Sequence, residues 1–357
     1  MTAYTVSFGQ TSSGIVLHAG DTETVLSGGT ASNTVVSSGG TEIISSGGRD
    51  AGARISAHGR QDVYGSAAGA TVSVTASQIV HSGGSASGTV VVGGTEIVSA
   101  GGTTTGTTIR RYFSSTFLSQ VSINGSEIVS SGGVASGTIV GSGGEQYVYG
   151  TASDTIISNV GFELVGSGGT ASGTIIGNGG NQDVYGTAIG TTISGGYQDL
   201  FSGATAISTT ISAGYQYVYG TAAGTIVENG TEFVRSGGSA TNIVINGGGA
   251  AEVQSGGNAS GITVSSGGTI IIDGGATING LTLNPGATEA IGDSASLSGL
   301  DVSGAITLAV LSGGTASGTH IERRNATSAS GVSRWQNQSY SNQRKKSLEC
   351  SVNFRPR

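Results

Sequence analysis

Residues 39–48 read Gly-Gly-Thr-Glu-Ile-Ile-Ser-Ser-Gly-Gly, and close copies of this phrase occupy residues 93–102 and 124–133. Each copy contains a Glu or Gln, which recurs along the chain at nearly regular intervals, apart from one longer gap between Glu96 and Glu127. The recurring positions are Glu23, Glu42, Gln61, Gln78, Glu96, Glu127, Gln146, Glu163, Gln182, Gln198, Gln216, Glu232 and Glu252, and Ile270 and Glu289 continue the spacing. A nearly fixed period of about 19 residues is typical of a repeat protein.

Two apolar columns accompany the repeated Glu or Gln. The residue two positions later is aliphatic in twelve of thirteen repeats, Gln254 being the exception, and a second aliphatic column that includes Val36 and Ile55 lies about half a repeat further on. Both columns sit in short β-branched runs separated by Gly-Gly or Ser-Gly-Gly, which favour strands and turns and show no helical period. Each repeat therefore predicts one rung made of short strands, with both columns facing inward.

A single rung cannot bury its apolar side alone, whereas a stack of rungs forms a continuous core. We therefore expect residues 1–320 to form an all-β, right-handed parallel β-helix, or β-solenoid, of about 16 rungs. Glycine at the corners would allow positive φ and close backbone approach.

The composition supports this fold class and excludes several others. Glycine supplies 67 of 357 residues, which argues against an ordinary helical domain, while 36% hydrophobic residues argue against a disordered linker. One cysteine, Cys350, and four scattered histidines give neither a disulfide framework nor a metal-ligand spacing. We expect no metal, cofactor or catalytic residue.

The charge changes abruptly near residue 320. Residues 1–320 contain six arginines and 19 acidic residues, a formal charge of −13, whereas residues 321–357 contain eight basic and two acidic residues, a formal charge of +6. The negative repeat region disfavours nucleic acid as a partner. We expect residues 321–357 to be a basic, non-repeat, disordered tail: a charged anchor, a nucleic-acid arm, or an out-of-frame extension of an interrupted passenger.

Residues 27–48 and 131–140 resemble the passenger repeats of AIDA-type autotransporter adhesins, and the resemblance covers about residues 10–320. It implies an exported β-helical rod at the cell surface, in the outer membrane or secreted, that mediates adhesion, self-association and biofilm growth as a virulence factor. It also implies host-cell surfaces, glycans or further copies of the chain as partners, and O-heptosylation of repeat Ser or Thr by a glycosyltransferase.

Two features of that family are not expected in this sequence, namely an export signal and a membrane β-barrel of alternating apolar strands. The sequence therefore indicates a passenger fragment. Two alternatives stay open: a polysaccharide-processing β-helix enzyme, and a nonfunctional truncated remnant. The first is disfavoured because the repeat region offers no clustered base with carboxylates or a metal.

Aromatic residues gather at positions that should face outward, because side chains alternate along a strand. The candidate interaction face consists of Tyr147, Tyr149, Phe162, Tyr185, Tyr197, Phe201, Tyr215, Tyr217, Tyr219 and Phe233. An exposed apolar face of this kind could bind glycans, a host surface or a second rod, and it could equally be a ladder that stabilises neighbouring rungs.

The long gap between Glu96 and Glu127 exceeds a normal rung by about 12 residues and contains Arg110, Arg111, Tyr112 and Phe113. An insertion in a solenoid maps to a loop, and such loops often bind partners. The alternative is a decayed rung whose core would hold Phe113, Phe117 and Leu118.

Overall fold

The computed structural model describes the chain except for residues 117–118, 299–300, 303–304, 318–319 and 322–357. The described residues contain no helix and form two compact units, Met1–Gln198 and Asp199–Arg357. Both units are parallel β-solenoids, and the described chain winds through about 16 turns. All but one residue of the predicted basic tail, as well as Phe117 and Leu118, lie outside the described residues.

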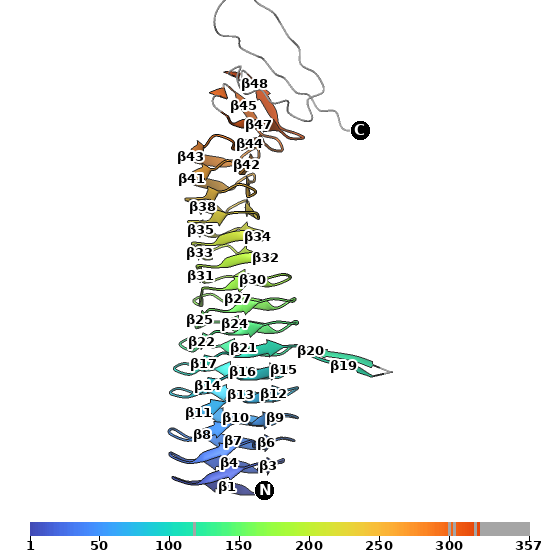
Figure 1. Ribbon diagram of the computed structural model, residues 1–357, viewed down its shortest axis with the longest axis vertical. Coiled ribbons are helices and arrows are strands. Elements are labelled where there is room, and N and C mark those ends of the chain that lie inside the picture. Colours follow the sequence, from blue (N-terminus) through green and yellow to red (C-terminus); the bar gives the residue numbers. More distant parts are fainter. Residues whose placement is uncertain (117–118, 299–300, 303–304, 318–319, 322–357) are drawn as a thin grey trace, which may run out of the picture. The chain divides into compact units, whose positions relative to one another are not determined.

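Each rung of the first unit contributes three strands, and equivalent strands of successive rungs pair in parallel (Figure 1). The first column holds β1 (Ala3–Val6), which has Tyr4 at the repeated position, and the strands that carry the repeated Glu or Gln: β4 (Thr22–Val25), β7 (Thr41–Ile44), β10 (Arg60–Val63), β13 (Ser77–Val80), β16 (Thr95–Val98), β21 (Ser126–Val129), β24 (Glu145–Val148), β27 (Phe162–Val165) and β30 (Asn181–Val184). The second column holds β2 (Thr11–Ser13), β5 (Thr30–Ser32), β8 (Arg49–Ala51), β11 (Ser66–Ala68), β14 (Ser85–Ser87), β17 (Thr103–Thr105), β22 (Val134–Ser136), β25 (Thr151–Ser153), β28 (Thr170–Ser172) and β31 (Thr187–Ile189). The third holds β3 (Val16–Leu17), β6 (Val35–Val36), β9 (Arg54–Ile55), β12 (Thr71–Ser73), β15 (Val90–Val92), β18 (Thr108–Arg110), β23 (Ile139–Val140), β26 (Ile156–Ile157), β29 (Ile175–Ile176) and the start of β32 (Thr192–Leu200).

The second unit repeats the same three columns. Its strands are β33 (Thr205–Ile207), β34 (Thr210–Val218), β35 (Thr221–Ala223), β36 (Ile226–Val227), β37 (Thr231–Val234), β38 (Ser239–Thr241), β39 (Val244–Ile245), β40 (Ala250–Val253), β41 (Asn258–Val264), β42 (Thr269–Ile272), β43 (Thr277–Leu283), β44 (Thr288–Ile291), β45 (Ser296–Ser298), β46 (Asp301–Val302), β47 (Thr307–Val310), β48 (Thr315–Ser317) and β49 (His320–Ile321).

The predicted inward columns are confirmed. Every aliphatic residue two positions after the repeated Glu or Gln, from Val25 to Val234, is fully buried, and so is the second column that includes Val36 and Ile55. A third inward column, of alanines such as Ala31 and Ala152, comes from the middle residue of the second strands. These three columns form the apolar part of the interior, mostly from small and β-branched side chains.

The predicted repeat position at Glu252 is wrong by one residue. Strand β40 pairs with β37 so that Ala251 aligns with Glu232 and Val253 aligns with Val234. Val253 is therefore the buried aliphatic residue of this rung. Gln254 does not belong to the aliphatic column, so the column has no exception at this rung. Aligning Glu252 with Glu232 would shift β40 by one residue and turn Val253 to the outside. Burial of Val253 is favoured over that alignment.

The length of a rung varies at its corners. The usual corner after the first strand has four residues, as in Ser45-Ser46-Gly47-Gly48, whereas Tyr149-Gly150 closes the same corner with two residues. A Cβ atom on Gly150 would clash with the carbonyl oxygens of Gly133 and Ser130, so the short corner requires glycine. This corner shortens by two residues the repeats that begin at Gln61, Gln146, Gln182 and Gln216.

Candidate interaction surfaces and the interior ladder

A ladder of carboxyl and amide side chains runs through the interior of the first unit. Glu127 and Gln146 are both fully buried and lie in register on β21 and β24. Gln146 Nε2 donates a hydrogen bond of 2.7 Å to Glu127 Oε2, and Thr138 Oγ1 donates one of 3.0 Å to the same oxygen. The same pattern of amide to carboxylate joins Gln61 to Glu42 at 2.8 Å.

The burial of the repeated Glu and Gln was not predicted from the sequence, where they served only to define the period. The signal was present, because side chains two positions apart on a strand share a face, so the burial of the aliphatic column places the Glu or Gln inside as well. A buried threonine column, which includes Thr107 and Thr138, supplies further donors to these carboxyl groups.

Burial perturbs the ionisation of the interior glutamates. Burial, assisted by the neighbouring Glu127, raises the pKa of Glu96 to about 8. Burial likewise raises the pKa of Glu163 and of Glu232 to about 7. One carboxyl oxygen of each of these three residues has no hydrogen-bond partner, which suits a protonated carboxyl group better than a carboxylate. The ladder therefore contains neutral carboxyl groups at neutral pH. Because its side chains are buried, a polymeric substrate cannot reach them.

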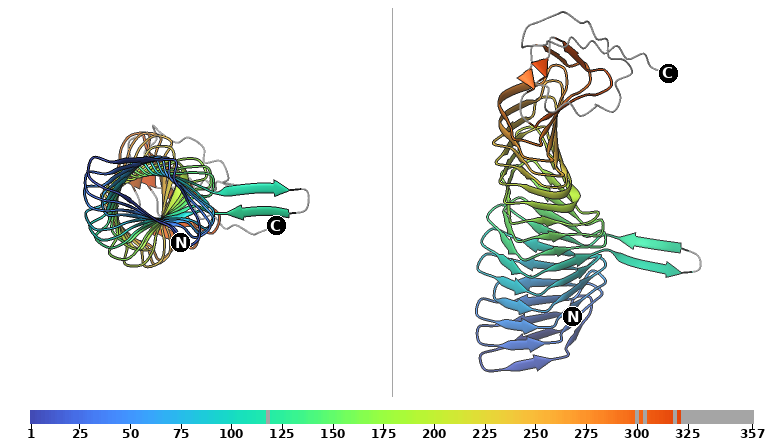
Figure 2. Two further views of the ribbon diagram at one scale, coloured as in Figure 1. Left: turned by 90° about the horizontal axis from the view of Figure 1, so that it is seen from below. Right: turned by 45° about the horizontal axis from the view of Figure 1, so that its top comes forward.

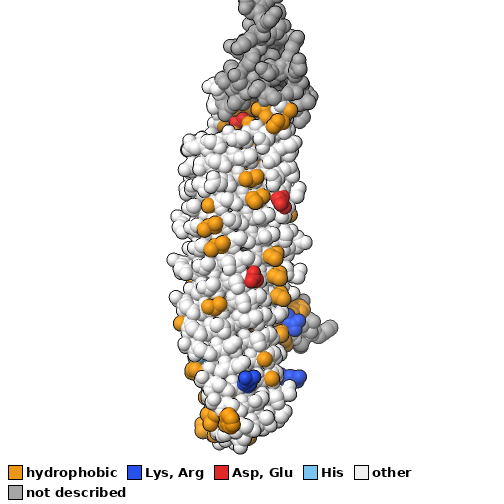
Figure 3. Space-filling model, turned by 60° about the vertical axis from the view of Figure 1, so that its left-hand side comes forward, with side chains coloured by type: hydrophobic (Ala, Val, Ile, Leu, Met, Phe, Trp, Pro, Cys, Tyr) orange, Lys and Arg blue, Asp and Glu red, His pale blue; other side chains and the backbone are white. Residues whose placement is uncertain are grey.

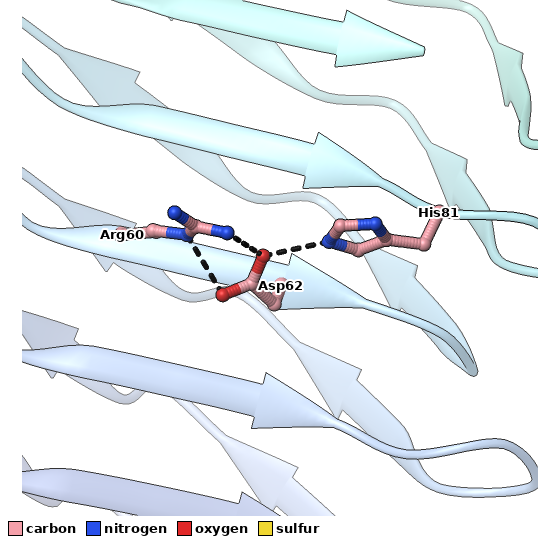
Figure 4. Close-up of polar contacts among 3 residues, drawn as sticks. All are labelled: Arg60, Asp62 and His81. Carbon is pink, nitrogen blue, oxygen red and sulfur yellow. Dashed lines mark hydrogen bonds and ion pairs between the residues drawn. The ribbon is translucent and has the colours of Figure 1, made fainter. Parts of the chain in front are cut away.

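A charged cluster lies on the outer surface of the first unit (Figure 4). Arg60 Nη2 and His81 Nε2 each lie 2.7 Å from Asp62 Oδ1, and Arg60 Nε donates to Asp62 Oδ2 at 2.8 Å. The His81 ring stacks on Tyr64 at a centroid distance of 4.1 Å. Asp62 is buried and lies on β10 with Arg60, whereas His81 follows β13 in the next rung. The contact of Asp62 with His81 therefore joins two neighbouring rungs.

The predicted aromatic residues of the first unit lie on the outside of their rungs. Tyr149, Tyr185 and Tyr197 are exposed, while Tyr147 and Phe162 are half-buried. The rings of Tyr147 and Phe162 meet edge to face at 6.3 Å, and Tyr147 Oη donates to Glu145 Oε2 at 2.8 Å. Burial, followed by this hydrogen bond, raises the pKa of Tyr147 to about 12.

The predicted aromatic residues of the second unit form a denser cluster. Tyr217 and Phe233 lie side by side on β34 and β37 and stack at 5.1 Å, and Tyr215 lies 6.0 Å from Phe233. The guanidinium group of Arg235 covers the rings of Tyr217 and Phe233 at 5.2 and 4.9 Å. In the same unit Tyr215 and Tyr219 are exposed, and Phe201 is half-buried.

The predicted insertion forms an antiparallel hairpin, made of β19 (Tyr112–Thr116) and β20 (Ser119–Ile123), that projects from the side of the first unit (Figures 1 and 2). Phe113 is 58% exposed, so it does not belong to the core of a decayed rung. Arg110 ends β18 and Arg111 follows it, both exposed at the base of the hairpin. We call residues 112–123 the arm.

The solvent-facing surface carries few charges. Figure 3 shows one face on which small apolar groups lie scattered among neutral polar atoms, with isolated acidic and basic side chains. The part of the chain described by the structure contains no group of His, Cys, Asp and Glu able to hold a metal ion, and none of its segments is a helix long and apolar enough to cross a membrane.

The stacked rungs define the class of parallel β-solenoid proteins, and comparison with solved structures gives the family. The chain is 35% identical to a TibC-catalysed, hyper-glycosylated TibA fragment, over 78% of this chain and 94% of that one, with a TM-score of 0.66. The chain belongs to the AIDA-type autotransporter adhesins, as a β-helical passenger region.

More distant solved structures add nothing to this assignment. They include the Agl-KA catalytic domain, at 11% identity over 82% of this chain and 62% of that one with a TM-score of 0.25. The tailspike protein of E. coli bacteriophage HK620 matches at 12% identity over 88% of this chain and 74% of that one, with a TM-score of 0.27. No protein-family model and no curated protein matches the sequence.

Proposed function

We propose that this chain is a cell-surface or secreted adhesive passenger that binds host-cell surfaces or their glycans, and further copies of itself, through its outward aromatic side chains. The observation that carries the proposal is the exposure of Tyr149, Tyr185 and Tyr219 at 45%, 43% and 42% on a surface with few charges. A tyrosine offers an apolar ring together with a hydroxyl group, and this combination suits recognition of polar surfaces that have apolar faces.

The repeated corner gives the proposal a matched control. Tyr64, Tyr149, Tyr185 and Tyr219 all precede the glycine of a two-residue corner, and Tyr64 is 42% exposed but lies outside the aromatic set. Substituting the other three tyrosines by Ser should weaken binding of the full chain to epithelial cells at least about tenfold, whereas Tyr64→Ser should not. Equal binding by the triple variant and the parent protein, with the fold retained, would refute the proposal.

We further propose that outward serines accept sugars, by analogy with the hyper-glycosylated TibA fragment. Ser136, Ser153 and Ser172 occupy the same outward position of successive rungs, at the ends of β22, β25 and β28. Co-expression with an autotransporter heptosyltransferase, followed by peptide mass spectrometry, should find heptose on this row. Modification confined to other residues, or none at all, would contradict the assignment.

The proposal includes no catalysis. Hydrolysis of a polysaccharide needs two carboxyl groups that flank the scissile bond, whereas the neighbouring Glu96 and Glu127 are fully buried. A screen of acidic and neutral polysaccharides should show no degradation by the full chain. Turnover that a single Asp substitution abolishes would favour the enzyme instead.

A further inference from the structure

One rung of the first unit brings a hydroxyl group against a side-chain amide in the buried interior. Thr155, which lies between β25 and β26, donates a hydrogen bond of 3.0 Å from Oγ1 to Gln146 Oε1 on β24. Gln146 is fully buried, and Thr155 is 1% exposed. Since a carbonyl bond is ~1.23 Å long, the hydroxyl oxygen lies within about 4.2 Å of the amide carbon Cδ.

A small movement would turn this hydrogen bond into a reactive contact. Attack on the amide carbon needs a distance of ~3–3.5 Å and an approach to the face of the amide. The last torsion of a glutamine side chain is broad, so the amide of Gln146 can turn its face to the hydroxyl group of Thr155. A shift of about 1 Å then suffices to bring the two atoms together.

Carboxyl groups lie on both sides of this amide. Glu127 and Glu163 pair in register with Gln146 in the neighbouring rungs, and both are fully buried. Gln146 Nε2 donates a hydrogen bond of 2.7 Å to Glu127 Oε2, and the hydroxyl groups of Thr104 and Thr138 also donate to Glu127. Three donors suit an ionised carboxylate. Glu127 therefore holds the amide nitrogen on the side opposite to the attacking hydroxyl group.

Glu163 is the group suited to move a proton. Burial raises the pKa of Glu163 to about 7, while two nearby polar groups, the amide of Gln182 and then the hydroxyl of Thr155, lower it. Glu163 Oε1 has no hydrogen-bond partner among the described residues. A carboxyl group whose pKa lies near the ambient pH exists in both forms, so it can accept a proton and return it.

The sequence distinguishes this rung from a similar one. Thr89 Oγ1 donates to Gln78 Oε1 at 2.9 Å, and both side chains are as deeply buried as those of Thr155 and Gln146. Gln78 Nε2, however, donates to the amide oxygen of Gln61 and not to a carboxylate. Among the repeated Glu and Gln positions of the sequence, Gln146 is the one amide with a glutamate in the repeat before it and in the repeat after it.

We propose that Thr155 and Gln146 form an intramolecular ester bond after the chain has folded. Thr155 Oγ1 forms a bond to Gln146 Cδ, and the hydroxyl proton passes to Glu163. The bond between Cδ and Nε2 then breaks, and the nitrogen leaves as ammonia with the proton that Glu163 returns. Glu127 stabilises the positive charge that develops on the departing nitrogen. One hydroxyl group and one primary amide thus become one ester and one ammonia molecule, without an oxidant or a cofactor.

The interior would preserve this bond. Ammonia is lost to the solvent, and the exclusion of water protects the ester from hydrolysis. The bond would join β24 to the residue before β26 and close a loop around the corner Tyr149-Gly150, so the rung would stay closed if its neighbours opened. The reaction happens once in each chain and consumes no external substrate. The inference therefore does not depend on the proposed adhesive function.

Mass spectrometry of the purified full chain, kept folded at pH 8, tests the bond directly. The intact mass should be lower than the sequence mass by one ammonia molecule, and tandem mass spectrometry of a digest should find Gln146 and Thr155 in one cross-linked peptide. A parent protein with the full sequence mass would overturn the proposal. So would a loss of ammonia that maps to an asparagine instead, and neither result requires a variant to fold.

Variants then test the role of each group. Thr155→Val removes the attacking oxygen and should keep the full mass of its own sequence, whereas Thr155→Ser should still form the bond. Glu163→Gln keeps the shape but cannot accept the proton, and it should slow the reaction at least about a hundredfold. The control Thr89→Val, in the similar rung, should lose ammonia like the parent. Loss of ammonia from Thr155→Val, or its prevention by Thr89→Val, would contradict the assignment.

Discussion

Gln146 Nε2 donates a 2.7 Å hydrogen bond to Glu127 Oε2 across one rung, and neither side chain is accessible to solvent. Because a shift of β24 by one residue would turn Gln146 outward and break this bond, the pair supports the alignment of β21 with β24. Buried polar networks specify a unique arrangement when their members are satisfied.

The first prediction is that the protein is more stable in mild acid. The pKa values of Glu96, Glu163 and Glu232 are raised to about 8, 7 and 7. Below about pH 4.5 these carboxyl groups are protonated in both the folded and the unfolded protein, and their contribution to the free energy of unfolding is fully present. That contribution is lost as the pH rises through the folded pKa values, because the unfolded state then releases its protons more readily than the folded state. Each group can contribute a slope of ~1.4 kcal/mol per pH unit in that window. The urea midpoint should therefore be lower at pH 8 than at pH 5.

The control for this prediction removes one titrating group. Glu96→Gln replaces the carboxyl group with a neutral amide of similar shape, so the urea midpoint should depend less on pH. A midpoint that rises with pH in the parent, or an unchanged slope in the variant, would contradict the assignment of neutral carboxyl groups to the interior.

The second prediction concerns the amide group of Gln146, which lies between the carboxyl groups of Glu127 and Glu163. Gln146→Glu would place a carboxyl group between Glu127 and Glu163, with three buried acids in consecutive rungs. We expect a loss of several kcal/mol at pH 8 and a much smaller loss at pH 5, because unpaired charge is expensive to bury. The matched variant Glu163→Gln adds an amide and should be tolerated at both pH values. Equal effects of Gln146→Glu at the two pH values would show that charge is not the cause.

The third prediction tests which residues face inward. Val148 is fully buried and the adjacent Tyr149 is 45% exposed. Val148→Asp should cost several kcal/mol and open the rung locally, whereas Tyr149→Asp should cost less than about 1 kcal/mol. Limited proteolysis and thermal unfolding should separate the two variants, and similar damage from both would show that the faces are assigned incorrectly.

The fourth prediction compares two glycines. Gly150→Ala would drive a Cβ atom into two backbone carbonyl oxygens, whereas Gly69 has a φ of 66° and open space around its Cβ position. Gly69→Ala should cost only the ~1–2 kcal/mol of a left-handed residue, while Gly150→Ala should cost more because the backbone must move. Thermal midpoints will rank the two variants, and the reverse order would contradict the close approach at the short corner.

Much of the fold could be predicted from the sequence because each rung repeats the same alternation. The columns of Val148 and Ile157 were predicted to face inward and are fully buried. The register around Glu252 could not be predicted from residue type alone. In this rung Ala251 occupies the position that holds Glu or Gln in other rungs, and Glu252 lies one residue later, so the glutamate suggests the wrong alignment. Only the pairing with β37 shows that Val253 is the buried residue.

The candidate surfaces were predicted less completely. The outward position of Tyr149 follows from strand alternation, but the cover that Arg235 gives to Tyr217 depends on side-chain packing between rungs. The insertion was found from its length, whereas its hairpin form was not predicted, since Phe113 suited a core as well as a loop. The sequence repeat predicts the strands and their inward residues well. It predicts poorly the segments that depart from the repeat.

The central claim is that the interior holds the rungs in register while the outward tyrosines make the adhesive contact. Covalent labelling of tyrosine side chains in the full chain, free and bound to an epithelial cell surface, tests it most directly. We predict that binding protects Tyr149, Tyr185 and Tyr219 from the label and leaves Tyr64, which is equally exposed in the free protein, as reactive as before. Protection of Tyr64 to the same degree, or of no tyrosine at all, would contradict the claim.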